Sequence, residues 1–228
     1  MPRLTLSFDN GPHPDVTPGV LDALAAADAR ATFFVCGKDA RDPAHRALLA
    51  EIRAAGHRVG NHTQTHRIEF GATRDPDAPR REIEDAQAAL ADFTDSEKLF
   101  RPYGAGGVLG PRLLSRAAVS HLCDGGYTCV LWNSVPRDWE DPTGWPERAL
   151  ADLRAQEWTL LVLHDIPTGA MRALPDFLAR AREAGAELTA ELPPACVPIR
   201  RGRVVGALDG IVNDERGAAE RAAPGRAR

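Results

Sequence analysis

The sequence predicts an α/β fold of the barrel type, in which six or seven strand–helix units follow one another in a single domain. Apolar runs of strand length alternate with segments of helical apolar spacing from the first residues onward. No long linker divides the 228 residues. Polar side chains directly follow several of the apolar runs, as they do where parallel barrel strands end at one rim.

The first half of the chain supplies four of the expected strands and three of the helices. Residues 31–36 (ATFFVC) are β-branched and aromatic, which is typical of a buried strand. Thr17-Pro18 and Asp42-Pro43 each place a capping residue before a proline, so we expect helices to begin there. The other strands are expected at residues 4–8, 58–60 and 98–101, a loop at residues 71–80, and a third helix around residues 83–93.

The second half continues the alternation. We expect helices at residues 111–123, 145–154 and 174–184, strands at 127–133 and 159–164, and a last strand at 186–192 or 197–199. Residues 214–228 lack periodicity and large apolar side chains, so we expect them to form a disordered tail. The folded domain is therefore predicted to span residues 1–213.

Composition excludes several classes of function. A net charge of −4 gives no reason to expect nucleic acid or an anionic membrane as a partner. No apolar run approaches the roughly 20 residues of a membrane span, and no apolar signal segment precedes the first strand, so we expect a cytoplasmic protein. The four cysteines include no CxxC pair, which argues against a thiolate zinc site.

Five polar segments follow expected strands and should therefore meet at the carboxyl-terminal rim of the barrel. Each also has an ordinary structural explanation. For example, Asp9 and Asn10 precede Gly11-Pro12 and suit a turn, and Trp139 can anchor a loop. The chemistry-bearing residues in these segments are Asp9, Asn10, His62, His66, Arg101, Tyr103, Asp138, Trp139 and His164.

The histidine pair gives the first chemical signal. His62 and His66 are four residues apart, and on a helical turn this spacing puts both imidazoles on one face, within reach of one metal ion. Two unrelated exposed histidines are the alternative.

In order and spacing, the segments SFDNGP, HTQTH, FRPYG, SVPRDW and LVLH resemble the five motifs of the polysaccharide deacetylases, which are carbohydrate esterase family four with the NodB-homology fold. The resemblance runs from residue 4 to about residue 185. It implies a distorted (β/α)7 barrel, a deacetylase-like catalytic domain over residues 1–213, and a bound divalent metal ion, above all Zn²⁺.

The resemblance also implies a role for each rim residue. Asp9 is the implied catalytic base, held by Arg101, and His164 is the implied general acid, tuned by Asp138. The implied metal ligands are Asn10, His62 and His66, and the implied substrate-binding residues are Tyr103 and Trp139.

Three positions depart from the family pattern. Asn10 stands where the family has a metal-binding aspartate, and a neutral amide attracts a cation less than a carboxylate does. FRPYG is one proline shorter than the common family form. Ser134 replaces the first aspartate of the fourth motif.

These residues predict a metal-dependent hydrolase of non-peptide amide bonds that deacetylates an N-acetylated sugar or polysaccharide. An amide needs an activated water and a protonated leaving nitrogen, which a carboxylate base and an imidazole acid provide. Two alternatives remain open. One is a metal-poor or metal-free hydrolase of ureides or imides on the same fold, and the other is a non-catalytic carbohydrate-binding relative. The expected partner is thus a carbohydrate or another small amide substrate.

Overall fold

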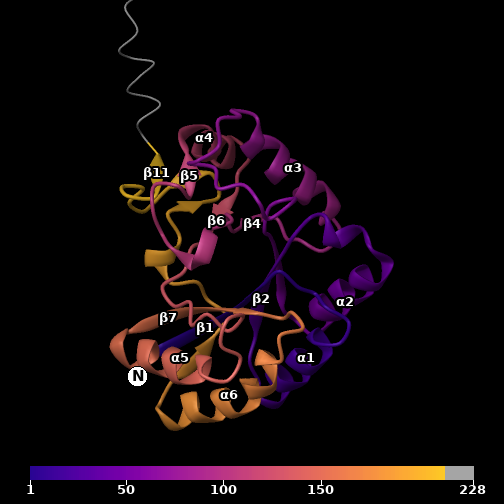
Figure 1. Cartoon of the computed structure of the whole chain (residues 1–228), viewed down its shortest axis with the longest axis vertical. Helices are drawn as coiled ribbons and strands as arrows, with labels where there is room; N and C mark the ends of the chain where they lie inside the picture. The colour runs from indigo at the N-terminus through magenta and orange to yellow at the C-terminus, as the bar shows by residue number, and fades with distance from the viewer. Residues whose placement is uncertain (214–228) are drawn as a thin grey trace, which may run out of the picture.

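The strands form a curled sheet around the centre of the molecule, and the helices pack outside it (Figure 1). The computed structural model describes residues 1–213, so the tail predicted for residues 214–228 lies outside the described residues. Six strands pair in parallel in the order β6-β4-β3-β2-β1-β7. Their bounds are β1 (Arg3–Asp9), β2 (Ala31–Val35), β3 (Arg58–Asn61), β4 (Leu99–Phe100), β6 (Thr128–Cys129) and β7 (Trp158–His164).

A single bridge closes the curl. Ser134 pairs with Leu161 of β7, and the backbone N–H of Val162 donates to the Ser134 carbonyl over 3.0 Å. The Ser134 hydroxyl also donates to Asp152 over 2.7 Å. The residue that departs from the fourth family motif therefore helps to close the barrel.

Short strands extend the sheet at two places. β8 (Glu187–Thr189) runs parallel to β1, whereas β9 (Ile199–Arg200) lies antiparallel to β6 and pairs with β10 (Arg203–Val204). The prediction of a parallel sheet is therefore wrong at this edge. Of the two candidates for the last strand, 186–192 contains β8, and 197–199 overlaps β9 only at Ile199. A separate two-stranded sheet joins β5 (Leu114–Ser115) to β11 (Val212–Asn213).

The helices begin and end close to the expected positions. Their bounds are α1 (Thr17–Ala26), α2 (Pro43–Ala54), α3 (Ala78–Ala89), α4 (Arg116–Asp124), α5 (Trp145–Ala155) and α6 (Leu174–Glu183). Asp42 caps α2 as expected, because its carboxylate accepts the backbone N–H of Ala44 over 2.8 Å. Thr17 is not a cap but the first residue of α1, and its hydroxyl accepts the N–H of His13.

Two predicted elements are shorter in the structure. The helix expected from residue 111 begins at Arg116, because residues 114–115 pair with β11 and Ser115 caps the helix by accepting the N–H of Ala118 over 3.1 Å. Of the strand expected over residues 127–133, only β6 forms. The chain after β6 leaves this pairing and reaches β7, where Ser134 pairs with Leu161.

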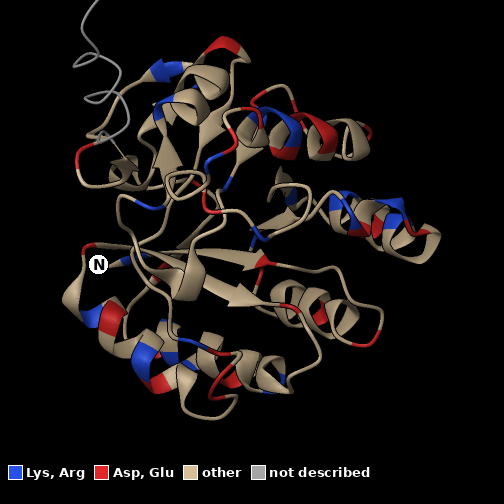
Figure 2. Ribbon diagram, turned by 45° about the horizontal axis from the view of Figure 1, so that its top comes forward, with Lys and Arg blue, Asp and Glu red and all other residues tan. Residues whose placement is uncertain are grey.

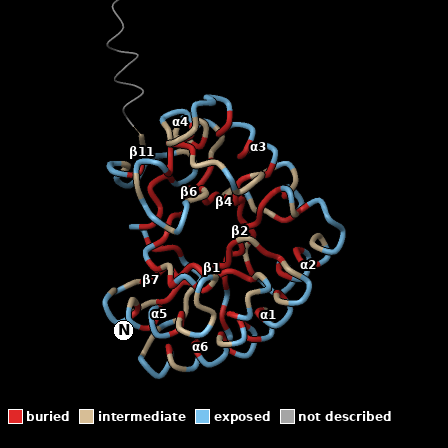
Figure 3. The backbone as a smooth tube through the Cα atoms, in the orientation of Figure 1, coloured by how far each residue is buried: buried red, intermediate tan, exposed pale blue. Residues whose placement is uncertain are grey.

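The core lies between the curled sheet and its helices. Figure 3 shows the buried chain along the strands and the exposed chain along the outer turns. β1 pairs with β7 over seven residues and is buried along nearly all its length, with Phe8 stacked on Phe33 at 5.0 Å. Burying one such side chain contributes on the order of 1.5–3 kcal/mol, so this central pair gives the rim a rigid base.

Charge lies on the outside of this core. Figure 2 shows both lysine or arginine and aspartate or glutamate along the outer helices. Within residues 1–213, no helix is long and apolar enough to cross a membrane.

Candidate active site

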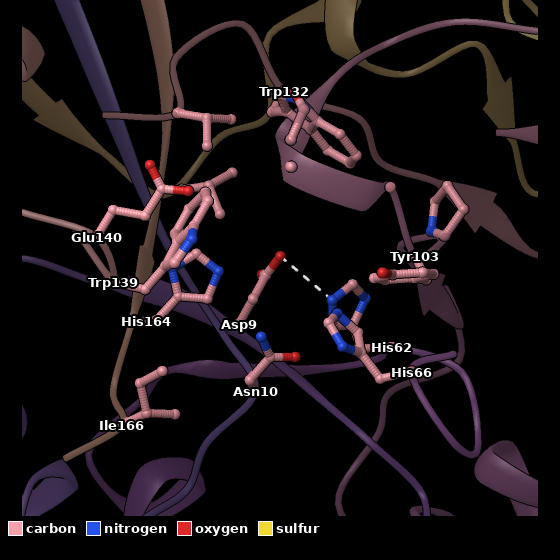
Figure 4. Close-up of a pocket in the computed structure, with 16 residues that line it drawn as sticks. Asp9, Asn10, His62, His66, Tyr103, Trp132, Trp139, Glu140, His164 and Ile166 are labelled. Carbon is pink, nitrogen blue, oxygen red and sulfur yellow. Dashed lines mark hydrogen bonds and ion pairs between the residues drawn. The ribbon is translucent and has the colours of Figure 1, made fainter. Parts of the chain in front are cut away.

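Seven of the nine predicted residues line one pocket, with a cavity of about 420 Å³ (Figure 4), and the other two, Arg101 and Asp138, are fully buried behind Asp9 and His164. Asp9 ends β1, and His164 ends the neighbouring β7, in register with it. His62 follows β3 and Arg101 follows β4. These side chains therefore meet at the carboxyl-terminal rim of the barrel, as predicted.

Arg101 holds the carboxylate of Asp9 in place. Its Nη1 donates to Asp9 Oδ1 over 2.7 Å and to the Ser7 hydroxyl over 2.8 Å. The guanidinium is fully buried and lies 4.0 Å from the ring centroid of Phe34. The contact expected between Arg101 and Asp9 is thus present, as a buried ion pair.

The charge on Asp9 follows from its surroundings. Burial alone would raise the pKa of Asp9, but nearby positive charge, above all the buried guanidinium of Arg101, lowers the pKa by more. Asp9 is therefore an ionised carboxylate at neutral pH, the form that a general base needs.

Asp138 holds His164 at two points. Its Oδ1 lies 2.8 Å from His164 Nδ1, and its Oδ2 accepts the backbone N–H of His164 over 2.9 Å. Because a carboxylate accepts at Nδ1, that nitrogen carries the proton, and Nε2 is left on the pocket side (Figure 4). Burial lowers the pKa of His164, but the hydrogen bond and the charge of Asp138 raise it by more, so the net shift is upward. This is the direction that suits a general acid.

His62 and His66 lie side by side, with ring centroids 4.6 Å apart, but not on a helical turn as predicted. They belong to a loop after β3 in which Thr63 and His66 have positive φ angles of 66° and 57°. This left-handed backbone turns the chain back on itself. The two rings therefore lie together as predicted, but a left-handed loop, and not a helical turn, brings them there.

The two imidazoles present neutral nitrogens to the pocket. His62 Nδ1 lies 2.9 Å from the carbonyl oxygen of Arg101, so it donates there and leaves Nε2 with its lone pair, 3.5 Å from Asp9 Oδ2. Burial lowers the pKa of His62 and lowers the pKa of His66 to about 3. The His62–Asp9 contact is therefore not an ion pair at neutral pH, and both rings have the protonation state of metal ligands.

Asn10 lies beside the histidines, with its amide oxygen on the side that faces them (Figure 4). It has a left-handed φ of 72°, and its Oδ1 accepts a weak hydrogen bond from the Cys36 thiol at 3.8 Å. Within residues 1–213, no three histidine, cysteine, aspartate or glutamate side chains gather around a possible metal position. Two imidazole nitrogens and one amide oxygen still fit a borderline cation such as zinc by donor type, without the charge of a carboxylate.

Aromatic and glycine residues form the walls of the pocket. Tyr103 packs edge-on against His66 at 4.4 Å, and Trp139 packs edge-on against His164 at 4.8 Å. Trp132, which the sequence analysis did not single out, donates its indole N–H to the Gly107 carbonyl over 2.9 Å. The available signal was its position at the end of an apolar run, two residues before the start of the fourth motif at Ser134.

A second buried carboxylate lies beneath the acid. Asp165 is fully buried, and its Oδ2 accepts the Thr17 hydroxyl over 2.6 Å. Its Oδ1 has no hydrogen-bond partner among the described residues, and burial raises the pKa of Asp165 to about 6. A Cβ at position 11 would meet this carboxylate at 2.1 Å, so the close approach requires Gly11. The hydrogen bond between Thr17 and Asp165 therefore connects the start of α1 to the residue that follows β7.

A barrel rim with an ionised carboxylate and a protonatable imidazole facing one pocket can perform general acid–base chemistry, of which amide hydrolysis is one case. The model of the polysaccharide deacetylase family matches residues 2–116. The chitooligosaccharide deacetylase of Sinorhizobium fredii is 33% identical over 168 residues, which is 72% of this chain and 72% of that protein. The peptidoglycan-N-acetylglucosamine deacetylase of Bacillus cereus is 32% identical over 142 residues, which is 61% of each chain.

The fold agrees with these matches. The structure of a family 4 carbohydrate esterase from Streptomyces lividans in complex with acetate has a TM-score of 0.65 and 25% sequence identity, over 81% of this chain and 90% of that one. This chain belongs to the polysaccharide deacetylase family. It is a hydrolase of carbon–nitrogen bonds other than peptide bonds, with the (β/α)7-type barrel that its motifs predict.

Proposed function

We propose that this chain removes the acetyl group from an N-acetylglucosamine unit of an uncharged chitin-type oligosaccharide. The observation that carries the proposal is the facing pair at the rim, in which Arg101 keeps Asp9 ionised and Asp138 favours the protonated form of His164. A base and an acid in opposite protonation states at one pH are what amide hydrolysis requires.

Two features support this choice of substrate. The relatives named above act on chitooligosaccharide and on the N-acetylglucosamine of peptidoglycan, so they share this sugar. Among the described residues, the pocket wall contains Asp9 and Glu140 but no lysine or arginine. A substrate with acidic groups would find no lysine or arginine side chain there to bind them, which favours an uncharged oligosaccharide. The aromatic rings of Tyr103 and Trp139 suit the flat faces of sugar rings.

The chain's own residues account for the proton transfers. Asp9 accepts a proton from the attacking water as the water oxygen bonds to the acyl carbon. The C–N bond then breaks, and His164 gives its Nε2 proton to the departing nitrogen. The products are acetate and the protonated amine, and transfer of a proton from Asp9 to His164 restores both groups, so one water is consumed for each amide bond broken. Proton transfer of this kind contributes typically 10²–10⁴-fold to a rate.

A divalent cation, above all zinc, would be held by His62, His66 and the amide oxygen of Asn10. When bound, it would polarise the acyl carbonyl and stabilise the charge that develops on it. The neutral imidazoles and the His62 Nδ1 contact with the Arg101 carbonyl support this assignment. No feature of the pocket favours a ureide or imide substrate over the amide.

The proposal is tested by incubating the protein with chitopentaose and with an acidic peptidoglycan fragment, each with and without added zinc. We expect equal amounts of acetate and free amine from chitopentaose, and slower release from the acidic fragment. Equal or faster release from the acidic fragment would contradict the substrate choice. No release from either substrate, with or without zinc, would contradict the function.

A further inference from the structure

We propose that Glu82 is a positioning residue, which fixes the loop that carries His62 and His66 and thereby sets the affinity of these imidazoles for a divalent cation. Glu82 belongs to α3, outside the barrel, and has no part in the proton transfers described above. The effect of Glu82 on the loop is independent of the proposed function, whereas its effect on cation affinity rests on that function.

Glu82 gives both carboxylate oxygens to one residue of the loop. Oε2 accepts the backbone N–H of Thr65 over 2.8 Å, and Oε1 accepts the Thr65 hydroxyl over 2.8 Å. The Glu82 side chain belongs to a residue only 6% exposed, so it is a buried polar group with a specific pairing and not a solvated residue of the helix. Thr65 directly precedes His66, so the contact acts one residue from a proposed ligand.

The rest of the loop depends on similar side-chain contacts. Asn61 donates its amide to the carbonyl of Ile83, the residue after Glu82, and accepts the N–H of Thr63. The Thr63 hydroxyl accepts the N–H of His66 over 3.1 Å. Glu82 and Ile83 both belong to α3, so this helix acts as an external template for the loop.

Backbone conformation makes the loop dependent on this template. Thr63 and His66 both have left-handed φ angles, which non-glycine residues keep only where the surroundings hold them. His62 has an additional fixed point at its ring, through the carbonyl of Arg101. The ring of His66 has only ring contacts with His62 and Tyr103 among the described residues. Glu82 should therefore influence His66 more than His62.

The experiment compares Glu82→Ala, Glu82→Gln and Glu84→Ala with the wild-type chain. Glu84 lies on the same helix, its side chain is 48% exposed, and its ion pairs with Arg80 and His121 do not involve the loop, so it is the matched control. Two quantities are measured without substrate: amide hydrogen exchange of the segment 61–67, and zinc affinity by competition with a chelator. We expect Glu82→Ala to speed exchange at Thr65 and His66 and to weaken zinc binding, each at least tenfold, and Glu84→Ala to change neither.

Glu82→Gln should restore most of both properties, because its oxygen can accept the Thr65 N–H while its NH₂ group donates to the Thr65 hydroxyl. If Glu82→Ala does not fold, Thr65→Val replaces it, since it removes only the hydroxyl contact, and at least threefold changes are expected. Exchange within twofold of wild type would overturn the positioning role. Faster exchange with unchanged zinc affinity would overturn the link to the cation. A wild-type chain that binds no zinc would contradict the proposed cation, while exchange would still decide the role of Glu82 in the loop.

Discussion

Replacing Asp138 with asparagine is the perturbation that the acid assignment predicts most sharply. Asp138 is fully buried and bonds both the ring and the backbone N–H of His164. Asparagine has the same shape but only one acceptor, which is a neutral oxygen. It therefore cannot accept both the backbone N–H and the Nδ1–H of His164, and it supplies no negative charge. A hydrogen bond to a charged group contributes about 1.5–3 kcal/mol, so its loss should lower the ratio of protonated to neutral His164 at a given pH roughly 10- to 100-fold.

The sign of the pH effect follows from the direction of the shift. The folded-state pKa of His164 is raised, so the acid form persists as pH rises and is lost only when pH passes through that raised pKa. Without Asp138, burial remains and lowers the pKa of His164. The alkaline limb of the kcat/KM profile should therefore move to lower pH in Asp138→Asn, and NMR titration of the His164 ring should move with it.

The assay measures kcat/KM for acetate release from chitopentaose across pH, with Asp22→Asn as an exposed control carboxylate. The control should keep the wild-type profile. An alkaline limb that stays at the same pH in Asp138→Asn would refute the reasoning, because Asp138 would then have no influence on the acid.

Three further outcomes follow from the same contacts. Asn10→Asp should tighten zinc binding in a chelator competition, because a carboxylate adds a full charge beside the ion; unchanged affinity would mean that Asn10 is not a ligand. Thr17→Val should lower the free energy of unfolding by about 1–3 kcal/mol, because buried Asp165 loses its hydrogen bond, and Thr17→Ser should retain it; equal thermal midpoints in all three chains would contradict this. His164→Ala should slow turnover least for amides with good leaving groups, and an equal loss for all leaving groups would argue against an acid role.

Much of the fold was predictable because each barrel unit leaves a local signal. Asp42-Pro43 marked the start of α2, and residues 31–36 marked β2. The start of α4 was missed although Ser115 was available as a cap, because the apolar spacing before it also fits a helix. The antiparallel direction of β9 was not predictable, since a two-residue strand at an edge carries no period of its own.

The site divides in a similar way. Asp9, Arg101 and His164 were predictable because strand ends and motif order both point to them. The local structure of His62 and His66 was not, because a spacing of four fits a helical turn as well as a left-handed loop. Glu82 was also invisible from the sequence, since its partner is 17 residues away, in a different element.

The central claim is that Asp9 is the base of a hydrolytic site and not only a turn residue before Gly11. The most direct measurement is kcat/KM of Asp9→Asn on chitopentaose, with thermal unfolding and zinc affinity measured on the same sample. We expect kcat/KM to fall at least about 100-fold, which is within the range for a general base. The thermal unfolding midpoint and the zinc affinity should stay close to wild type. Wild-type turnover by Asp9→Asn would contradict the account.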